Sequence, residues 1–224
     1  MQYEGRIFRP PSEAESLILQ STVGCSQNGC AFCSMYKEKR FHIRPVAAVC
    51  ADVDEIASGP WARAFSRVFL ADGDALMRKT EEQLAIFAHI YARLPATERI
   101  TCYASPASIA AKTDAELRSL AQGGLNMVYM GLESGSDAVL ARMNKGATAA
   151  EIIRAGQRVR AAGMRLSVTA IIGLGGASGS EEHAIETGRA LSAMQPEYIG
   201  LLTLMLEGEE PLYADYRAGR FTLP

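Results

Sequence analysis

Ser16-Leu17-Ile18-Leu19-Gln20-Ser21, an apolar run typical of a buried strand, is followed after three residues by Cys25-Ser26-Gln27-Asn28-Gly29-Cys30-Ala31-Phe32-Cys33. The second stretch places three thiols within nine positions, with the spacing C-x-x-x-x-C-x-x-C. Three thiolates on one loop can bind one face of an iron–sulfur cluster, and a cluster of four irons then keeps one iron open. An open iron is a chemical site, whereas a fully ligated cluster usually carries electrons.

The same order of apolar strand and helix recurs along the whole chain. The expected strands cover residues 16–21, 67–70, 100–104, 126–132, 165–172 and 198–204. The expected helices cover residues 46–58, 80–93, 113–122, 136–143 with 148–162, 180–194 and 211–217. Nearly continuous apolar strands that alternate with helices predict an α/β fold with a parallel sheet covered by helices. Six units fit this length, because a strand–crossover–strand unit takes about 30 residues or more.

The composition bounds the class of protein and its compartment. The chain has 224 residues, of which 48% are hydrophobic, and 23 basic residues nearly balance 25 acidic ones. This balance gives no reason to expect binding to nucleic acid or to a membrane surface. No apolar run approaches the ~18–20 residues that span a bilayer, and no signal peptide is evident. The odd number of cysteines, five, then favours metal or redox chemistry in a reducing cytoplasm over a disulfide scaffold.

Polar or glycine-rich residues follow each expected strand. They are the cysteine loop, Asp72-Gly73-Asp74, Ser105, Glu133-Ser134, residues 173–176 and Glu207-Gly208. In parallel α/β sheets the ligand site lies at the carboxyl ends of the strands. The sequence therefore predicts one site at this edge of the sheet.

The cysteine loop also admits other interpretations. A zinc site completed by His42 is one, although zinc sites usually come as two separated halves and no second half is present. Cys50 and Cys102 are expected to be small buried hydrophobes rather than ligands. Besides a catalytic cluster, two hypotheses stay open: a non-catalytic iron–sulfur or zinc-binding module in electron transfer, and a metal-free barrel enzyme whose thiols are structural.

The cysteine loop resembles that of the radical S-adenosylmethionine (radical SAM) enzymes, whose usual signature is C-x-x-x-C-x-aromatic-C. Phe32 stands at the aromatic position, and the first gap is one residue longer here. Residues 129–136 with 143–146 look like the fourth-strand motif of the branch that contains oxygen-independent coproporphyrinogen oxidase. Residues 171–176 look like the fifth-strand turn of that branch.

The resemblance runs from about residue 17 to residue 206, and it implies a fold and a domain organisation. The fold is a partial (β/α)6 barrel of parallel strands, the radical SAM core. Residues 1–224 form a single core domain, with the six strand–helix units at about 16–206. Residues 207–224 are a C-terminal extension that reads like the start of a further element.

The resemblance also implies an activity. Cys25, Cys30 and Cys33 bind a 4Fe–4S cluster, whose open iron is chelated by the amino and carboxylate groups of S-adenosylmethionine. One electron from the reduced cluster cleaves this cofactor to methionine and a 5′-deoxyadenosyl radical, which takes a hydrogen atom from the substrate. The expected protein is thus an oxidoreductase or transferase-like enzyme in the cytoplasm. Its partners are a small-molecule substrate of unknown identity and an electron donor such as flavodoxin or ferredoxin, with no nucleic acid and no membrane.

Seven further residues match positions that bind the cofactor in this family: Phe32, Gly73, Asp74, Glu133, Lys145, Thr169 and Gly173. Gly73 and Asp74 lie where the family has a Gly-Gly-Glu segment that receives the methionyl ammonium. Lys145 lies where relatives have an arginine that pairs with the methionyl carboxylate. For most of these residues an ordinary structural role is the alternative: a solvated Asp-Gly turn, a helix-capping carboxylate after the fourth strand, a loop lysine and a strand threonine.

Overall fold

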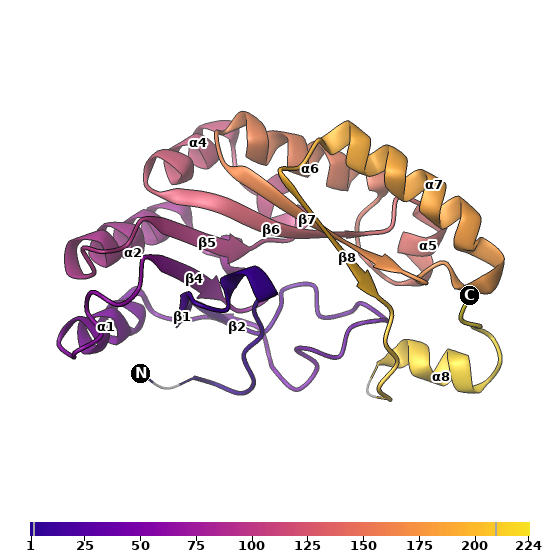
Figure 1. Ribbon diagram of the computed structural model, residues 1–224, viewed down its shortest axis with the longest axis horizontal. Helices are drawn as coiled ribbons and strands as arrows, with labels where there is room; N and C mark the ends of the chain where they lie inside the picture. Colours follow the sequence, from indigo (N-terminus) through magenta and orange to yellow (C-terminus); the bar gives the residue numbers. More distant parts are fainter. Residues whose placement is uncertain (2, 209) are drawn as a thin grey trace.

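A six-stranded parallel sheet forms the centre of the molecule (Figure 1). The computed structural model describes residues 1, 3–208 and 210–224. The strand order is β1-β4-β5-β6-β7-β8, and every neighbouring pair is parallel. The bounds are β1 Leu17–Gln20, β4 Arg67–Ala71, β5 Arg99–Tyr103, β6 Leu125–Glu133, β7 Arg165–Ile172 and β8 Tyr198–Thr203. The predicted α/β fold, a partial (β/α)6 barrel, is thereby confirmed.

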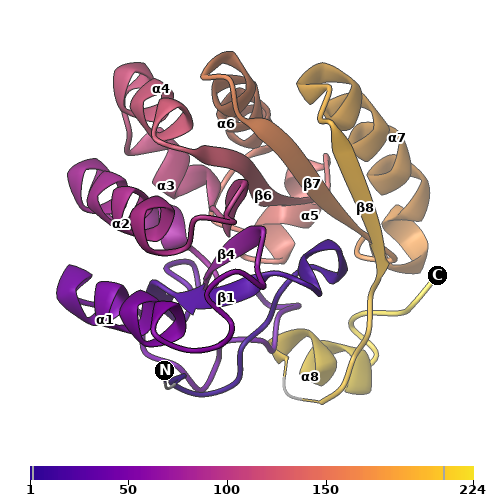
Figure 2. The ribbon, with the colours of Figure 1, turned by 60° about the vertical axis from the view of Figure 1, so that its left-hand side comes forward.

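Helices α1, α2, α4, α6 and α7 lie in an arc on the outer side of the curved sheet, and α5 and α8 lie apart from that arc (Figure 2). Their bounds are α1 Val46–Ala57, α2 Thr80–Arg93, α3 Pro106–Ala110, α4 Asp114–Gln122, α5 Asp137–Arg142, α6 Ala149–Ala161, α7 Gly176–Met194 and α8 Pro211–Arg217. Within the described part of the chain, no helix is both long and apolar enough to cross a bilayer.

Local sequence signals explain where several helices begin. Thr113 and Glu116 form a capping box at the start of α4, in which each side chain binds the other residue's backbone N–H. At the start of α2, Lys79 is the N-cap and makes no side-chain capping bond, and the Thr80 hydroxyl donates to Glu116. α7 begins at Gly176, four residues before the expected start, because the glycine-rich turn leads directly into the helix.

Several short elements were not predicted. Strands β2 (Thr22–Val23) and β3 (His42–Ile43) pair in antiparallel fashion and bracket the cysteine loop. Helix α3 and the 3-10 turns η1 (Pro11–Glu13) and η2 (Ala75–Met77) complete the set. Elements this short carry too few residues for a hydrophobic period to be visible in the sequence.

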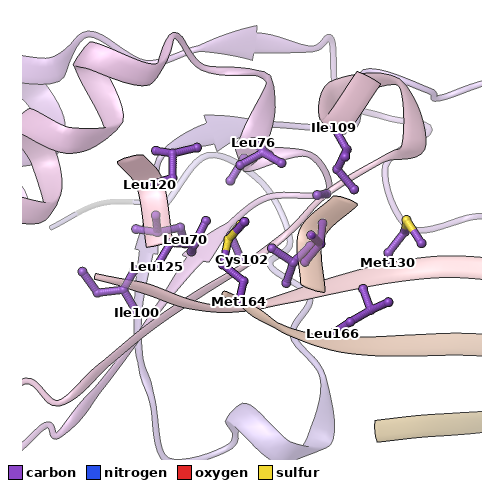
Figure 3. Close-up of a cluster of buried hydrophobic side chains, with 14 of the residues drawn as sticks. Leu70, Leu76, Ile100, Cys102, Ile109, Leu120, Leu125, Met130, Met164 and Leu166 are labelled. Atoms are coloured by element: carbon purple, nitrogen blue, oxygen red, sulfur yellow. The ribbon is translucent and has the colours of Figure 1, made fainter. Parts of the chain in front are cut away.

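The main hydrophobic core lies between the sheet and the outer helices (Figure 3). On β7, Leu166, Val168 and Ala170 are buried, while the residues between them are partly exposed, as expected for a strand with period two. Cys102 is fully buried in this core and Cys50 packs against it. The expectation of a buried thiol is therefore confirmed for Cys102, whereas Cys50 is only partly buried at the edge of the core.

Strand β8 forms one edge of the sheet and is much less covered than the other strands. It pairs with β7 alone among the described strands. Ile199 and Leu201 are 52% and 60% exposed, whereas their register partners on β7, Val168 and Ala170, are buried. The barrel is thus open between β8 and β1, and this opening leads to the carboxyl ends of the strands.

Candidate cofactor site

A cavity of about 430 Å³ lies at the carboxyl ends of the strands, where the sequence predicts the site. Its wall includes eight of the ten predicted site residues: Cys25, Cys30, Phe32, Cys33, Gly73, Glu133, Lys145 and Thr169. The other two, Asp74 and Gly173, are not among the lining residues. The fold therefore gathers most of the predicted positions around one space, from the cysteine loop, the strands or strand ends of β4, β6 and β7, and the loop after α5.

Hydrogen bonds hold the cysteine loop in one conformation. The Lys37 ammonium donates to the carbonyl oxygens of Asn28 and Cys30, at 2.7 and 2.9 Å. The Asn28 amide donates to the Tyr36 carbonyl at 2.6 Å. On its other side, the loop is tied to the end of α5, because the Ala31 N–H donates to the Met143 carbonyl at 2.9 Å. A loop fixed in this way presents its thiols without an ordering cost on ligand binding.

The three thiols are close enough to influence one another. Burial is the main cause that raises the pKa of Cys25 to about 12, and the neighbouring thiols Cys30 and Cys33 add to it. Burial also raises the pKa of Cys30 and of Cys33. Binding to iron requires thiolates, so a metal centre would release these protons.

The three thiols line the same cavity. Among the described residues, no three His, Cys, Asp or Glu side chains gather closely enough to hold one metal ion. Ligands of a multi-iron cluster need not meet at one point, because each binds a different iron. Gly73 lets the chain after β4 pack closely against the cysteine loop, because a Cβ at this position would lie 2.7 Å from the Tyr36 ring and 2.9 Å from the Cys25 Cβ.

The two aspartates around Gly73 are buried, and both support the loop. Asp72 pairs with Lys39 at 2.8 Å and accepts a hydrogen bond from the Gly24 N–H at 3.0 Å. Asp74 accepts from the backbone N–H and the hydroxyl of Ser105, at 3.0 and 2.7 Å, and from the Ser26 hydroxyl. Asp74 thus joins the cysteine loop to the end of β5 in this structure.

Glu133 and Lys145 form an ion pair on the cavity wall. The Lys145 Nζ lies 2.9 Å from the Glu133 Oε1, and both side chains are 11% exposed. Burial lowers the pKa of Lys145, but the Glu133 carboxylate and the nearby Cys30 thiol outweigh this effect, so the pKa is raised. The wall therefore carries one fixed positive and one fixed negative charge beside the thiols. The alternative roles of a solvated loop lysine and a surface carboxylate are wrong.

The remaining predicted residues differ in their surroundings. Thr169 lies on β7 beside Gly131 of β6, and its partly exposed side chain faces the cavity. Phe32 packs against a small apolar cluster that includes Leu204 and Leu212. Gly173 has φ +90°, a conformation that favours glycine. It lies near the Leu204 side chain, but Gly173 itself is not among the residues that line the cavity.

Sequence reasoning missed His183, a buried residue of α7 that binds Ser134 beside Glu133. The sequence carries a signal for it: His183 and Thr187 are polar residues at the helical spacing of the buried residues Ala190 and Met194 on α7. The Tyr36 hydroxyl was missed as well: it is buried at the cavity wall and has no hydrogen-bond partner within the described structure.

Comparisons with known proteins place this geometry in a family. The model of the radical SAM superfamily matches residues 19–187, more than half of the chain. No curated protein sequence matches the chain significantly.

Solved structures share the fold at low sequence identity. The methyltransferase TsrM from Kitasatospora setae, solved with cobalamin and a [4Fe-4S] cluster, is 19% identical with a TM-score of 0.72 over 99% of this chain and 45% of its own. Coproporphyrinogen III oxidase (HemN) from Escherichia coli is 16% identical with a TM-score of 0.64, covering 85% of this chain and 44% of its own. Methylornithine synthase (PylB) is 14% identical with a TM-score of 0.65, covering 88% and 55%.

The chain spans about half of the length of each of these three proteins: 45% of TsrM, 44% of HemN and 55% of methylornithine synthase. Coproporphyrinogen oxidase represents the branch that the sequence resembles. Members of the matched family are enzymes, and their cofactors are a 4Fe–4S cluster and S-adenosylmethionine, as the sequence predicts. The family match, the parallel half-barrel and the cysteine-lined cavity agree, and the chain belongs to the radical SAM superfamily.

Proposed function

We propose that the chain is the core of a radical enzyme in which Cys25, Cys30 and Cys33 hold a 4Fe–4S cluster with one open iron. The observation that carries this proposal is that the three thiols share one cavity with a buried pair of opposite charges, Glu133 and Lys145. When bound, the cluster supplies the electron that cleaves S-adenosylmethionine into methionine and the 5′-deoxyadenosyl radical, which abstracts hydrogen from a small-molecule substrate.

The charges of the cavity wall suit the methionyl part of the cofactor, which carries an ammonium and a carboxylate. Lys145 offers a point charge to the carboxylate, and Glu133 offers an acceptor to the ammonium or to a ribose hydroxyl. Because the two side chains already satisfy each other in this structure, binding exchanges their mutual contact for contacts to the cofactor. Phe32, Gly73 and Thr169 shape the rest of this wall.

For Asp74 and Gly173, contact with the cofactor stays a prediction. The hydrogen bonds of Asp74 to Ser26 and Ser105 support an indirect role, in which it holds the cysteine loop against the end of β5. Gly173 follows β7 in the turn before α7, and because it has no side chain, its backbone is the part available to a ligand.

Apolar side chains supply the exclusion of water that radical chemistry needs. Met35, Met130, Leu202 and Leu204 line the cavity together with the Tyr36 ring. A largely apolar wall protects a reactive intermediate from side reactions with solvent. We assign the protein to the cytoplasm, with an electron donor such as flavodoxin or ferredoxin, because an oxygen-sensitive cluster requires a reducing compartment.

Electron paramagnetic resonance tests the proposal directly. Protein reconstituted with iron and sulfide under anaerobic conditions and then reduced should show a cluster signal that changes when S-adenosylmethionine is added. Lys145→Met should keep the signal but weaken the response to the cofactor. A spectrum that the cofactor leaves unchanged in the wild-type protein would support the non-catalytic electron-transfer module instead.

A further inference from the structure

A buried histidine joins two strand ends that border the cavity. His183 of α7 is 6% exposed. Its Nε2 lies 3.0 Å from the carbonyl oxygen of Ile171, near the end of β7, and its Nδ1 lies 2.8 Å from the Ser134 Oγ, just after β6. A carbonyl oxygen can only accept, so Nε2 carries the proton and Nδ1 of the neutral ring accepts from the Ser134 hydroxyl.

The loop after β6 is held along the same face of α7 by further contacts. The Gly135 N–H donates to the Thr187 hydroxyl at 3.0 Å, and the Ser136 hydroxyl donates to Glu182 at 2.8 Å. A Cβ on Gly135 would lie 2.1 Å from the Glu186 carbonyl oxygen, so the loop backbone touches the helix directly. The histidine is thus the buried centre of a clamp between this loop and α7.

The clamp holds the backbone next to Glu133, which lies on the cavity wall. Glu133 directly precedes Ser134 and has φ +63°, in the left-handed region that non-glycine residues seldom occupy. Such a backbone is strained and persists only where neighbouring contacts hold it. The Ser134 hydroxyl also accepts from the Ser136 N–H at 3.0 Å, so the turn after Glu133 closes around the atom that His183 binds.

We propose that His183 is a positioning residue which, through Ser134, holds Glu133 in the orientation that pairs with Lys145 on the cavity wall and receives the cofactor. This inference rests on the proposed function, since it assigns Glu133 and Lys145 to S-adenosylmethionine. His183 itself lies outside the cavity lining and has no direct contact with the ligand space. Its effect is therefore on the affinity for the cofactor.

Two substitutions separate the two hydrogen bonds of the ring. In His183→Asn the amide oxygen stands near the position of Nδ1 and keeps an acceptor for Ser134, while the bond to Ile171 is lost. In His183→Gln the longer amide reaches toward Ile171, while the acceptor for Ser134 is lost. His89→Gln, on α2 beside Asp54, is a control for histidine replacement elsewhere.

The experiment measures the dissociation constant of S-adenosylmethionine by anaerobic calorimetry, on reconstituted proteins matched for iron content, with thermal unfolding of each variant. We expect His183→Gln to weaken binding about 10- to 100-fold, the usual range for supporting residues around a metal site. His183→Asn and His89→Gln should stay close to the wild-type value. Wild-type affinity in His183→Gln, or equal losses in the Asn and Gln variants that follow their unfolding temperatures, would overturn the inference.

Ser134→Ala removes a single hydroxyl and provides a second test should a histidine variant fold poorly. If His183 acts through this hydroxyl, Ser134→Ala should weaken binding by itself, and the double variant with His183→Gln should be no weaker than the worse single variant. Losses that add in the double variant contradict the inference. Absence of binding to the wild-type protein with an intact cluster contradicts the proposed function as well, so the two failures are distinguishable.

Discussion

Lys39 and Asp72 form a buried ion pair beneath the cysteine loop. Their side chains are 3% and 0% exposed, and the Lys39 Nζ lies 2.8 Å from the Asp72 Oδ2. The same carboxylate oxygen accepts from the Gln20 amide and the Gly24 N–H, both at 3.0 Å. Lys39 therefore helps to fix the start of the loop and does not face solvent.

Replacing Lys39 by Met should destabilise the protein strongly, because the Asp72 carboxylate is left buried without its counter-charge. Loss of one partner of a buried pair costs about 3–5 kcal/mol. The measurement is the free energy of unfolding in urea. Arg189→Met, which removes an exposed pair with Glu186, serves as the control and should cost about 0–1 kcal/mol. Equal effects of the two substitutions contradict this description of the loop base.

His183 should make stability depend on pH. Burial lowers its pKa from the ordinary 6.5, although the bond to the Ile171 carbonyl raises it. The unfolded chain therefore binds the proton at a higher pH than the folded chain, and stability falls as pH drops below about 6.5. Below the folded pKa this loss levels off.

The check is urea unfolding between about pH 5 and pH 8, on the wild-type protein and His183→Asn. The variant cannot titrate at this position, so its free energy of unfolding should fall less toward acid pH. Parallel curves for the two proteins contradict the assignment of a buried neutral ring.

For individual residues, the sequence predicted which residue types lie at the strand ends, but it did not predict which contacts they make. The cysteines, Glu133 and Lys145 were found because each follows an expected strand or a family motif. The bonds of Asp74 to Ser26 and Ser105, and of His183 to Ser134, join residues 31 to 49 positions apart. Such contacts exist only after the sheet forms, so no local sequence pattern predicts them.

Helix α8 supports the cysteine loop from outside the main core. The Leu212 N–H donates to the Ala31 carbonyl at 2.9 Å, between two of the thiols. The Leu212 side chain is 1% exposed and belongs to the apolar cluster that also packs against Phe32. The segment after β8, expected as an extension, is thus part of the wall behind the loop.

Leu212→Ala should loosen this support. Truncation of a buried leucine costs about 2–5 kcal/mol, and here the cavity opens beside the loop that presents the thiols. We expect a lower unfolding temperature and faster release of iron to a chelator from the reconstituted protein. Tyr216→Ala on the same helix, at an exposed position, is the control and should change neither. Unchanged iron release in Leu212→Ala contradicts the supporting role of α8.

The sequence predicted the long elements well and the short ones poorly. All six strands of the parallel sheet were expected, since each is a continuous apolar run between polar turns. Strands β2 and β3 were missed because each has two residues, and α3 because it has five. The start of α7 was misplaced because glycines at 175 and 176 were interpreted as a turn, whereas packing carries the helix through them.

The molecule as a whole is an open half-barrel, and the wall of the cavity at its strand ends combines thiols, a buried charge pair and apolar side chains. On the open side of the sheet, Leu202 of β8 and Met205 just after it are both exposed and on the cavity wall. A molecule that enters the cavity from this side would meet an apolar surface first. The thiols and the charge pair are therefore more completely enclosed than this apolar entrance.

The proposed reaction of this core is the reductive cleavage of S-adenosylmethionine. The direct measurement is the release of 5′-deoxyadenosine from anaerobically reconstituted, reduced protein incubated with S-adenosylmethionine, with Cys30→Ala as the control. We expect 5′-deoxyadenosine from the wild-type protein and none from the variant. Absence of 5′-deoxyadenosine from wild-type protein whose cluster is intact and reduced would contradict it.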